Sequence, residues 1–414
     1  MKHVLLTLVT VLLASFQTLL AQTPSNNPND YAGADSDRIQ AAVNAAPLNQ
    51  GVVHIPARRP DDEANRDYWL LDRAILLPAN TTIYFENCTV KLSDKCRDNF
   101  IRSANAGIGI EKVEAIENLR VIGIGKVEFF GADHPRATGD SAKTLGVRTY
   151  GTDAGKEGES QTGDWRNIGL LFVKVRRFQV ENIAFIQAHA WSLSFEKCSE
   201  GVIRHLRFEA DETREIDGRM EKVLNVDGVD LRKGCHNIVI DGISGHTGDD
   251  LVAITAINPQ TKSGGQLQST EVCDYSEEED LSVDNIVIRN VNGYAAGGHQ
   301  IVRLLNASGI KLSNVIIDGV VDSSPVGVVD RATIRIGDSN PAWGGVTPLG
   351  DASAVIVRNV ASKARHAVLI AGSLTDSIIT NVVNYSKECR GLTYESGEEN
   401  VKNVLLSNWT DIEP

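Results

Sequence analysis

The sequence has few aromatic residues, few cysteines and no excess of positive charge, and the last two shortages each exclude a class of protein. Only 6% of its 414 residues are aromatic, and 41 lysines and arginines face 54 aspartates and glutamates, for a net charge of −13. Nucleic-acid binding needs a surplus of basic residues on the binding face, so we predict no nucleic-acid partner. An anionic sugar is still possible as a ligand, because local basic stretches can line a groove on an acidic body.

Cysteine is scarce, with six residues in the whole chain. Even the nearest two, Cys88 and Cys96, lack the paired spacing and the histidine partners of zinc ligands. We therefore predict no metal site and no cofactor, and we expect most cysteines to be small buried hydrophobic residues. A disulfide between Cys88 and Cys96 is left open.

Long hydrophobic runs are absent after the first residues. Residues 1–21 carry Lys2 and His3, then the largely apolar run Val4–Leu13, then small residues ending in Leu-Leu-Ala, which is typical of a cleavable secretory signal. This run is shorter than the roughly 20 residues that a membrane-spanning helix needs, and no later segment is apolar enough. The sequence predicts a signal peptide over 1–21 and a secreted or periplasmic mature chain over 22–414, without a membrane span. We expect a monomer.

What the chain does have is turn formers and β-branched residues. With 36 glycines, 12 prolines and 42% hydrophobic residues, it has the composition of a globular protein with many turns. Residues Asp37–Ala46 show helical spacing of apolar positions, and Ser36 stands where a capping residue is expected. Gly51–Pro56 and Thr81–Leu92 have the patterns of strands.

A loose phrase recurs after these segments: an Asn, Asp or Gly, then β-branched residues, then another Asn and an apolar residue. Several copies start about 23 to 25 residues apart, a period typical of solenoids. Each copy is too short to bury its apolar face alone, so stacked coils would share one core. The copies are Phe178–Ile183, His236–Ile243, Asp284–Val291, Gly309–Val315, Ala354–Val360, Ser377–Val382 and Asn400–Val404.

The predicted fold is all-β: a single-stranded, right-handed parallel β-helix with a short N-terminal capping helix that covers an otherwise open sheet edge. A leucine-rich repeat has a similar period but is disfavoured, because leucine is not the recurring residue. Two stretches, about 131–165 and 258–280, break the rhythm and are predicted to be long loops inserted between coils. Such loops serve as functional walls or as plain surface decoration.

The densest group of acids is Asn225-Val-Asp227-Gly-Val-Asp230, followed about one coil later by Gly248-Asp249-Asp250. Stacking predicts that Asp249 lies about one strand spacing, roughly 4.8 Å, from Asp227. Like charges that close raise the pKa of at least one carboxyl group, which glycoside hydrolysis requires. One acid then protonates the departing oxygen, and another carboxylate attacks or activates water. Simple turn capping and a calcium site are the alternatives.

Two further motifs, Gly298-His299 and Arg335-Ile336-Gly337, complete an ordered set. In this order the sequence resembles glycoside hydrolase family 28, the polygalacturonases and rhamnogalacturonases, whose pattern is Asn-x-Asp, Asp-Asp, Gly-His-Gly and Arg-Ile-Lys. The beginning of the mature chain also resembles the pectate-lyase-like β-helices. The resemblance covers nearly the whole mature chain.

The resemblance implies a role for each matching residue. Asp249 would be the general acid, and Asp227 and Asp250 would polarise a water that attacks with inversion. His299 would orient or tune the acid. Arg335 would bind a sugar carboxylate through its planar guanidinium, beside Asn225 as a further substrate-binding residue.

The sequence departs from the family at two positions, where Gly337 replaces the lysine and Gln300 replaces the second glycine. Arg303, Lys262 or Arg232 could supply the missing cation, or the sugar bound there is neutral, as in rhamnogalacturonan. The predicted function is a secreted hydrolase of a pectic or related acidic polysaccharide. The alternatives are a polysaccharide lyase on the same fold, with an Arg or Lys base and often calcium, and a carbohydrate-binding β-helix such as an adhesin.

Overall fold

The computed structural model describes residues 24–61, 65–96, 98–107, 110, 112–134, 152–153, 156–157, 164–257, 279–306, 309–341, 344–385 and 390–411. The predicted signal segment, Lys262, Cys273, Cys389 and most of both predicted insertions lie outside these residues. Among the described residues, no helix has the length and apolar character that crossing a membrane requires.

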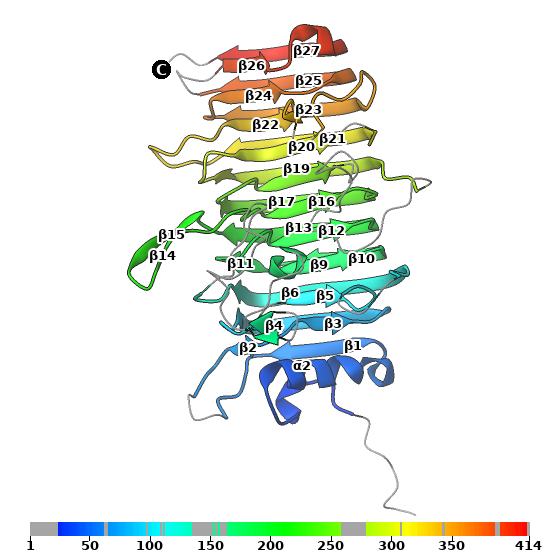
Figure 1. Cartoon of the computed structure of the whole chain (residues 1–414), viewed down its shortest axis with the longest axis vertical. Coiled ribbons are helices and arrows are strands. Elements are labelled where there is room, and N and C mark those ends of the chain that lie inside the picture. The colour runs from blue at the N-terminus through cyan, green and yellow to red at the C-terminus, as the bar shows by residue number, and fades with distance from the viewer. Residues whose placement is uncertain are drawn as a thin grey trace, which may run out of the picture.

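Most of the described strands belong to two long parallel sheets, which we name sheet A and sheet B (Figure 1). In each sheet the spatial order of the strands follows the sequence. Sheet A consists of β1 (Val52–Pro56), β4 (Thr81–Leu92), β6 (Ile116–Phe130), β10 (Val175–Glu181), β13 (Ser199–Glu209), β17 (His236–Thr247), β19 (Val283–Ala295), β21 (Leu312–Asp322), β23 (Ala352–Ser362), β25 (Leu374–Asn384) and β27 (Val401–Asp411), with β2 (Trp69–Leu71) and β11 (Ala184–Ile186) beside them.

Sheet B has shorter strands. They are β3 (Ile75–Leu77), β5 (Ile101–Ser103), β9 (Leu170–Val173), β12 (Leu193–Glu196), β16 (Val229–Arg232), β18 (Val252–Ala256), β20 (Gln300–Asn306), β22 (Ala332–Ile336), β24 (His366–Ile370) and β26 (Arg390–Tyr394). The smaller elements are the hairpin β14 (Thr213–Ile216) and β15 (Arg219–Lys222), the pair β7 (Thr152–Asp153) and β8 (Lys156–Glu157), and the 3-10 turns Pro28–Asp30, Ala46–Asn49, Asp164–Asn167 and Glu398–Asn400.

The chain alternates between the two sheets as it climbs the stack. Strand β16 of sheet B leads into β17 of sheet A, and the next strand, β18, returns to sheet B beside β16. All neighbours within each sheet run parallel, so every circuit returns in the same direction. The fold is therefore a parallel β-helix, and it is right-handed, as crossover connections between parallel strands of one sheet are. This agrees with the fold that the sequence predicted. All seven copies of the recurring phrase lie in strands of sheet A or at their ends.

The core runs along the axis between the sheets. In β4 buried and half-buried side chains alternate, as expected when one face of a strand points inward. Ile, Val and Leu fill most interior positions, and phenylalanines stack near the N-terminal end, where Phe85, Phe129, Phe185 and Phe208 follow one another with ring centres 4.9 to 5.8 Å apart. Cys88, Cys96, Cys198 and Cys235 are buried among these residues, which confirms the prediction for the cysteines that the structure describes.

The recurring asparagines have a conformational cause. At two places in the long strands of sheet A a single residue adopts a positive φ and bends the strand, and asparagine tolerates this conformation better than other side chains. One bend recurs at Asn237, Asn285 and Asn314. The other recurs at residues that include Asn290 and Asn359, with φ of 56° and 60°. The asparagines of the recurring phrase therefore mark the two positions at which each long strand of sheet A bends.

The N-terminal helix differs in detail from the prediction. It is α2 (Asp35–Asn44), which begins two residues before the predicted start, and Ser36 lies inside it rather than capping it. The hydroxyl of Ser36 instead accepts the N–H of Asp72 at 2.9 Å, and the buried carboxylate of Asp35 accepts from the guanidinium of Arg58 and from the N–H of Leu70. The partners of these polar residues lie outside the helix, in the first coil. The hydrogen bonds therefore anchor the helix to that coil and do not cap its end. Figure 1 shows α2 across the N-terminal end of the stack.

Candidate functional site

The outer face of sheet B carries polar side chains that are hidden from water. In β16, Asp230 and Arg232 alternate with core residues and therefore point outward, yet each is only 1% exposed. Strand register places Asp230 in one row with Ser194, Arg303 and Arg335. Buried charges facing away from a hydrophobic core are costly unless they are paired, and they mark this face as a candidate site.

Three carboxylates meet at the edge of this face. Asp227 precedes β16, and Asp249 and Asp250 precede β18. The N–H of Gly228 donates to the carbonyl of Asp250 at 3.0 Å, so Asp227 is level with Asp250 in the stack. The sequence had predicted that Asp227 would be level with Asp249. Asp249 lies one position earlier in register, where its N–H donates to the carbonyl of Val226 at 3.2 Å.

Gly248 lies directly before Asp249, where the chain passes close to the neighbouring coil. A Cβ atom at Gly248 would lie 2.4 Å from the backbone nitrogen of Glu212 and 2.5 Å from a methyl group of Val226. Only glycine allows the chain to pass so close to the neighbouring coil. The chain then turns Asp249 and Asp250 toward the edge of sheet B.

The environment of the three carboxylates favours protonation. Burial raises the pKa of Asp227 well above its ordinary value, and the charges of Asp249 and Asp250 raise it further. Burial also raises the pKa of Asp250, against the opposing effect of the Arg303 guanidinium. Asp227 is 5% exposed, and its Oδ2 has no hydrogen-bond partner among the described residues. Burial and like charge therefore favour the protonated form within this cluster.

His299 faces the carboxylates from the next coil. Its Nδ1 lies 3.0 Å from Oδ1 of Asp249, and this contact raises the pKa of His299. The residue after it, Gln300, donates its backbone N–H to Oδ1 of Asp250 at 3.0 Å. Asp249, Asp250 and His299 offer atoms within 4.8 Å of one another, a spacing that suits a cation. His299 and Arg303 already face these two carboxylates.

Two arginines and one further aspartate form a network beside the carboxylates. Arg303 bridges Asp250 at 3.2 Å and Asp338 at 2.7 Å, and Arg335 lies 3.1 Å from the same oxygen of Asp338. Burial alone would raise the pKa of Asp338, but the N–H of Asn340 and the two guanidinium groups outweigh it and hold that pKa below its usual range. Asp338 was not predicted from the sequence as a site residue. Its position three residues after Arg335 could have indicated that the two side chains pair.

Gly337, which stands where the resembled family has lysine, is required by the backbone. Its φ is +76°, and a Cβ atom there would lie 2.6 Å from the Cα of Gly372 on the next coil. A lysine does not fit this position. Of the candidate replacements, Arg303 is in the site, whereas Arg232 is buried with its guanidinium 4.8 Å from the ring centre of Trp191.

A cavity of about 370 Å³ adjoins the network on its C-terminal side. Three of its lining residues are arginines, Arg303, Arg331 and Arg335, against the two acids Asp338 and Glu395. Arg331 pairs with Glu395 at 2.7 Å. His299, Gln300, Ser339 and Asn340 complete the lining, so the cavity adjoins the carboxylate cluster. Its excess of positive charge suits an anionic group.

The structure brings together Asp227, Asp249, Asp250, His299, Arg303 and Arg335 as the sequence predicted. Asn225 lies two residues before Asp227 in the segment that leads into β16, where it adopts a φ of +57°. Asp230 is an addition to the predicted set, because burial raises its pKa to about 7.

Comparison with known proteins confirms the class of fold. No family model matches the sequence, and no curated protein matches it. An exopolygalacturonase of Thermotoga maritima aligns over 92% of this chain and 91% of its own, with 14% identity and a TM-score of 0.50. A mutant tailspike protein of E. coli bacteriophage HK620, solved in complex with pentasaccharide, aligns over 92% of this chain and 62% of its own, with 14% identity and a TM-score of 0.53.

PfbA, a surface adhesin of Streptococcus pneumoniae, aligns over 94% of this chain and 93% of its own, with 10% identity and a TM-score of 0.41. The described residues thus belong to the class of right-handed parallel β-helices. At these identities the likeness extends to the fold and not to an activity, because proteins of different function share the fold.

Proposed function

We propose that this protein is a glycoside hydrolase that cuts a pectic or related acidic polysaccharide with inversion. The observation that carries the proposal is the buried cluster of Asp227, Asp249 and Asp250 beside His299. A glycosidase of this type needs a protonated and an ionised carboxyl group at the same pH. Shared burial of like charges supplies both. The resemblance to glycoside hydrolase family 28 supports the same assignment.

In the proposed reaction, the proton that the cluster shares moves to Asp249, which donates it to the departing glycosidic oxygen, and Asp227 is then ionised and able to act as a base. Its side chain is 19% exposed and that of Asp250 is 2% exposed, so Asp249 is the more accessible of the two to a substrate. Water attacks the anomeric carbon from the opposite face and loses its proton to the carboxylate of Asp227 or Asp250. The new C–O bond forms as the old one breaks, and protonated His299 stabilises the Asp249 carboxylate that remains.

The arginine-lined cavity supports an acidic substrate. Arg335 and Arg331 have planar guanidinium groups that can bind a sugar carboxylate in a bidentate manner. Their partners Asp338 and Glu395 hold them in place, and Arg303 leaves one positive charge in excess among the lining residues. A uronate next to the cleaved bond would be bound there.

The test compares the parent protein with Asp249→Asn on homogalacturonan and rhamnogalacturonan, with release of reducing ends as the readout. We expect the parent to release reducing ends and the variant to lose activity by about 1000-fold, the size of a general-acid contribution. The matched control is Asp284→Asn, which removes a carboxylate from the start of β19 in sheet A and should leave activity unchanged.

Two outcomes would contradict the proposal. Products that absorb in the ultraviolet as unsaturated uronides would indicate a lyase, for which Arg335 is the candidate base because burial lowers its pKa. Binding of the polysaccharides by the parent without any product would indicate an adhesin-like protein.

A further inference from the structure

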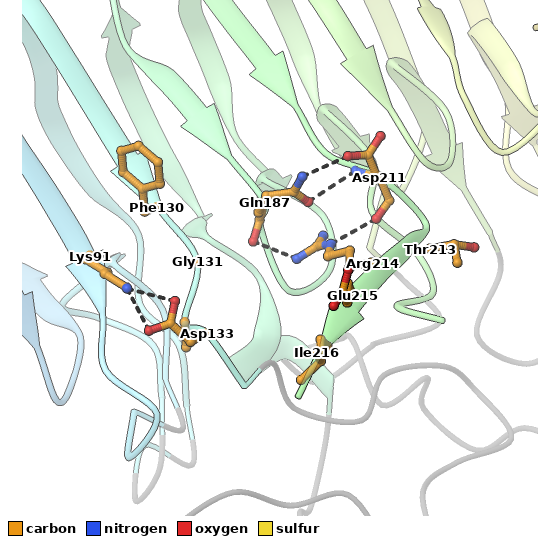
Figure 2. Close-up of a pocket in the computed structure, with 11 residues that line it drawn as sticks. Lys91, Phe130, Gly131, Asp133, Gln187, Asp211, Thr213, Arg214, Glu215 and Ile216 are labelled. Atoms are coloured by element: carbon orange, nitrogen blue, oxygen red, sulfur yellow. Dashed lines mark hydrogen bonds and ion pairs between the residues drawn. The ribbon is translucent and has the colours of Figure 1, made fainter. Parts of the chain in front are cut away.

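A second cavity lies on the N-terminal side of the carboxylate cluster, between strand ends of sheet A and the β14–β15 hairpin. Its volume is about 400 Å³ (Figure 2). Figure 1 shows the hairpin projecting from the side of the stack. The residues used in the argument are Lys91, Phe130, Asp133, Gln187, Asp211 and Arg214, and none of them belongs to the proposed reaction.

The cavity and the carboxylates follow one column of strand ends. Gln187 follows β11, Asp211 follows β13 and Asp249 follows β17, and these strands are neighbours in sheet A. The two sites also touch. Gly248, next to Asp249, packs directly against the backbone of Glu212, next to Asp211. A polysaccharide lying along this column would reach both the cavity and the carboxylates.

Arg214 holds the wall of the cavity in place. Its guanidinium donates to the backbone carbonyls of Asp211 at 2.9 Å, Gln187 at 2.9 Å and Ala188 at 2.6 Å. The side-chain amide of Gln187 donates to Oδ2 of Asp211 at 2.8 Å. Figure 2 shows these three side chains meeting at one end of the cavity. A wall fixed in this way needs little ordering when a ligand binds.

The chemistry of the lining opposes that of the arginine-lined cavity. Lys91 lies 2.8 Å from both carboxylate oxygens of Asp133, and the donors of Arg214 are directed at carbonyls. Both cations are therefore engaged, and the lining carries three carboxylates, those of Asp133, Asp211 and Glu215, against two cations, although Oδ1 of Asp211 also lies 3.1 Å from Nε2 of His246 outside the lining. Such a surface repels a uronate and accepts hydrogen bonds from hydroxyl groups. Phe130 adds an apolar surface for the C–H face of a sugar ring.

We propose that this cavity binds an uncharged sugar unit of the polysaccharide through its hydroxyl groups, while the arginine-lined cavity binds an acidic unit. The inference rests on the proposed function and deepens it. It narrows the substrate to a polysaccharide in which neutral units lie near acidic ones, and it assigns the two kinds of unit to opposite sides of the cleaved bond.

The test measures binding by calorimetry in an Asp249→Asn background, so that cleavage does not interfere. The probes are oligosaccharides of rhamnogalacturonan, which alternate neutral and acidic units, and of homogalacturonan, which are acidic throughout. Thr213→Trp places bulk in the cavity from an exposed position of β14. Met220→Trp is the matched control, because Met220 lies on β15 of the same hairpin, is 66% exposed and is not among the residues that line the cavity.

We expect Thr213→Trp to weaken binding of the rhamnogalacturonan probe by about tenfold and Met220→Trp to leave it unchanged. Equal weakening for both probes, no effect of Thr213→Trp, or no binding of the rhamnogalacturonan probe would overturn the inference. The proposed function is tested separately, by measuring whether the parent protein releases reducing ends from the polysaccharides. Cleavage without an effect of Thr213→Trp refutes only this inference, and a selective effect without cleavage refutes only the hydrolase.

Discussion

Nδ1 of His299 lies 3.0 Å from Oδ1 of Asp249, and this contact makes the stability of the protein depend on pH. The pKa of His299 is raised by Asp249, so the folded protein holds this proton more tightly than the unfolded chain does. The stabilisation is therefore complete below the unfolded pKa of about 6.5 and is lost as pH rises through the higher folded pKa.

We expect His299→Gln to reduce the free energy of unfolding more at about pH 5.5 than at about pH 9, by less than about 1 kcal/mol because the pair is partly exposed. Urea unfolding of parent and variant at both pH values measures this difference. His236→Gln, at an exposed position of β17, is the control for removal of a histidine outside the site. A His299→Gln effect of equal size at both pH values would contradict the prediction.

Asp227 is a second source of pH-dependent stability, and it acts in the same direction as His299: the raised pKa of each group makes the folded state less stable as pH rises. Burial and the neighbouring carboxylates raise its pKa well above the ordinary value, so ionising it costs the folded state free energy as pH rises from about 4 upward. We expect Asp227→Asn to be more stable than the parent at pH 7 by about 1–2 kcal/mol and to lose activity. Thermal unfolding and product release measure the two effects. A variant that is less stable at pH 7 would refute this account of the site.

The sequence predicted the stacking but not the register of the site. Recurring asparagines and β-branched residues indicated the coils, because each bend of sheet A needs a residue that tolerates a positive φ. The predicted pairing of Asp227 with Asp249 was wrong by one residue, because the register places Asp250 beside Asp227. Register depends on packing between coils, of which the approach of Gly248 to Glu212 is an example. No pattern within one coil reports such a contact.

Burial and pairing were equally hidden. The residue types of Asp227, Asp249, Asp250 and His299 suggested a site, but their pKa shifts depend on burial that only the folded chain defines. Asp338 was missed because its two arginine partners come from different strands, β20 and β22. The capping role predicted for Ser36 failed for the same reason, as its hydroxyl bonds to Asp72 of a later segment.

Restoring the lysine of the resembled family at position 337 should harm the protein. Gly337 has a φ of +76°, and a Cβ atom there would lie 2.6 Å from the backbone of Gly372. We expect Gly337→Lys to lower the free energy of unfolding by about 3 kcal/mol or more, through strain and overpacking. The matched control is Gly327→Lys, because Gly327 also has a positive φ of +92° but nothing within 4 Å of its Cβ position. Equal losses for both variants in urea unfolding would show that close packing at Gly337 is not the cause.

Removal of divalent cations should leave activity unchanged. Asp249 and Asp250 are spaced for a cation, but His299 and Arg303 already face them with positive charge. A bound metal would have to displace these groups or share the carboxylates with them. We expect product release from the active parent to be the same after treatment with a chelator as before. Loss of activity that calcium restores would indicate a metal-dependent reaction and favour the lyase.

Asp338 should be the residue on which the arginine network depends. Its carboxylate lies between Arg303 and Arg335 at 2.7 and 3.1 Å, and all three side chains are largely buried. Asp338→Asn leaves two guanidinium groups close together without the charge that they share, so we expect a loss of about 3 kcal/mol in the free energy of unfolding. The control is Asp318→Asn, which breaks the exposed pair with Arg358 on sheet A and should cost less than about 1 kcal/mol. If the two variants unfold at the same urea concentration, the charge shared by Arg303 and Arg335 does not hold this side of the site together.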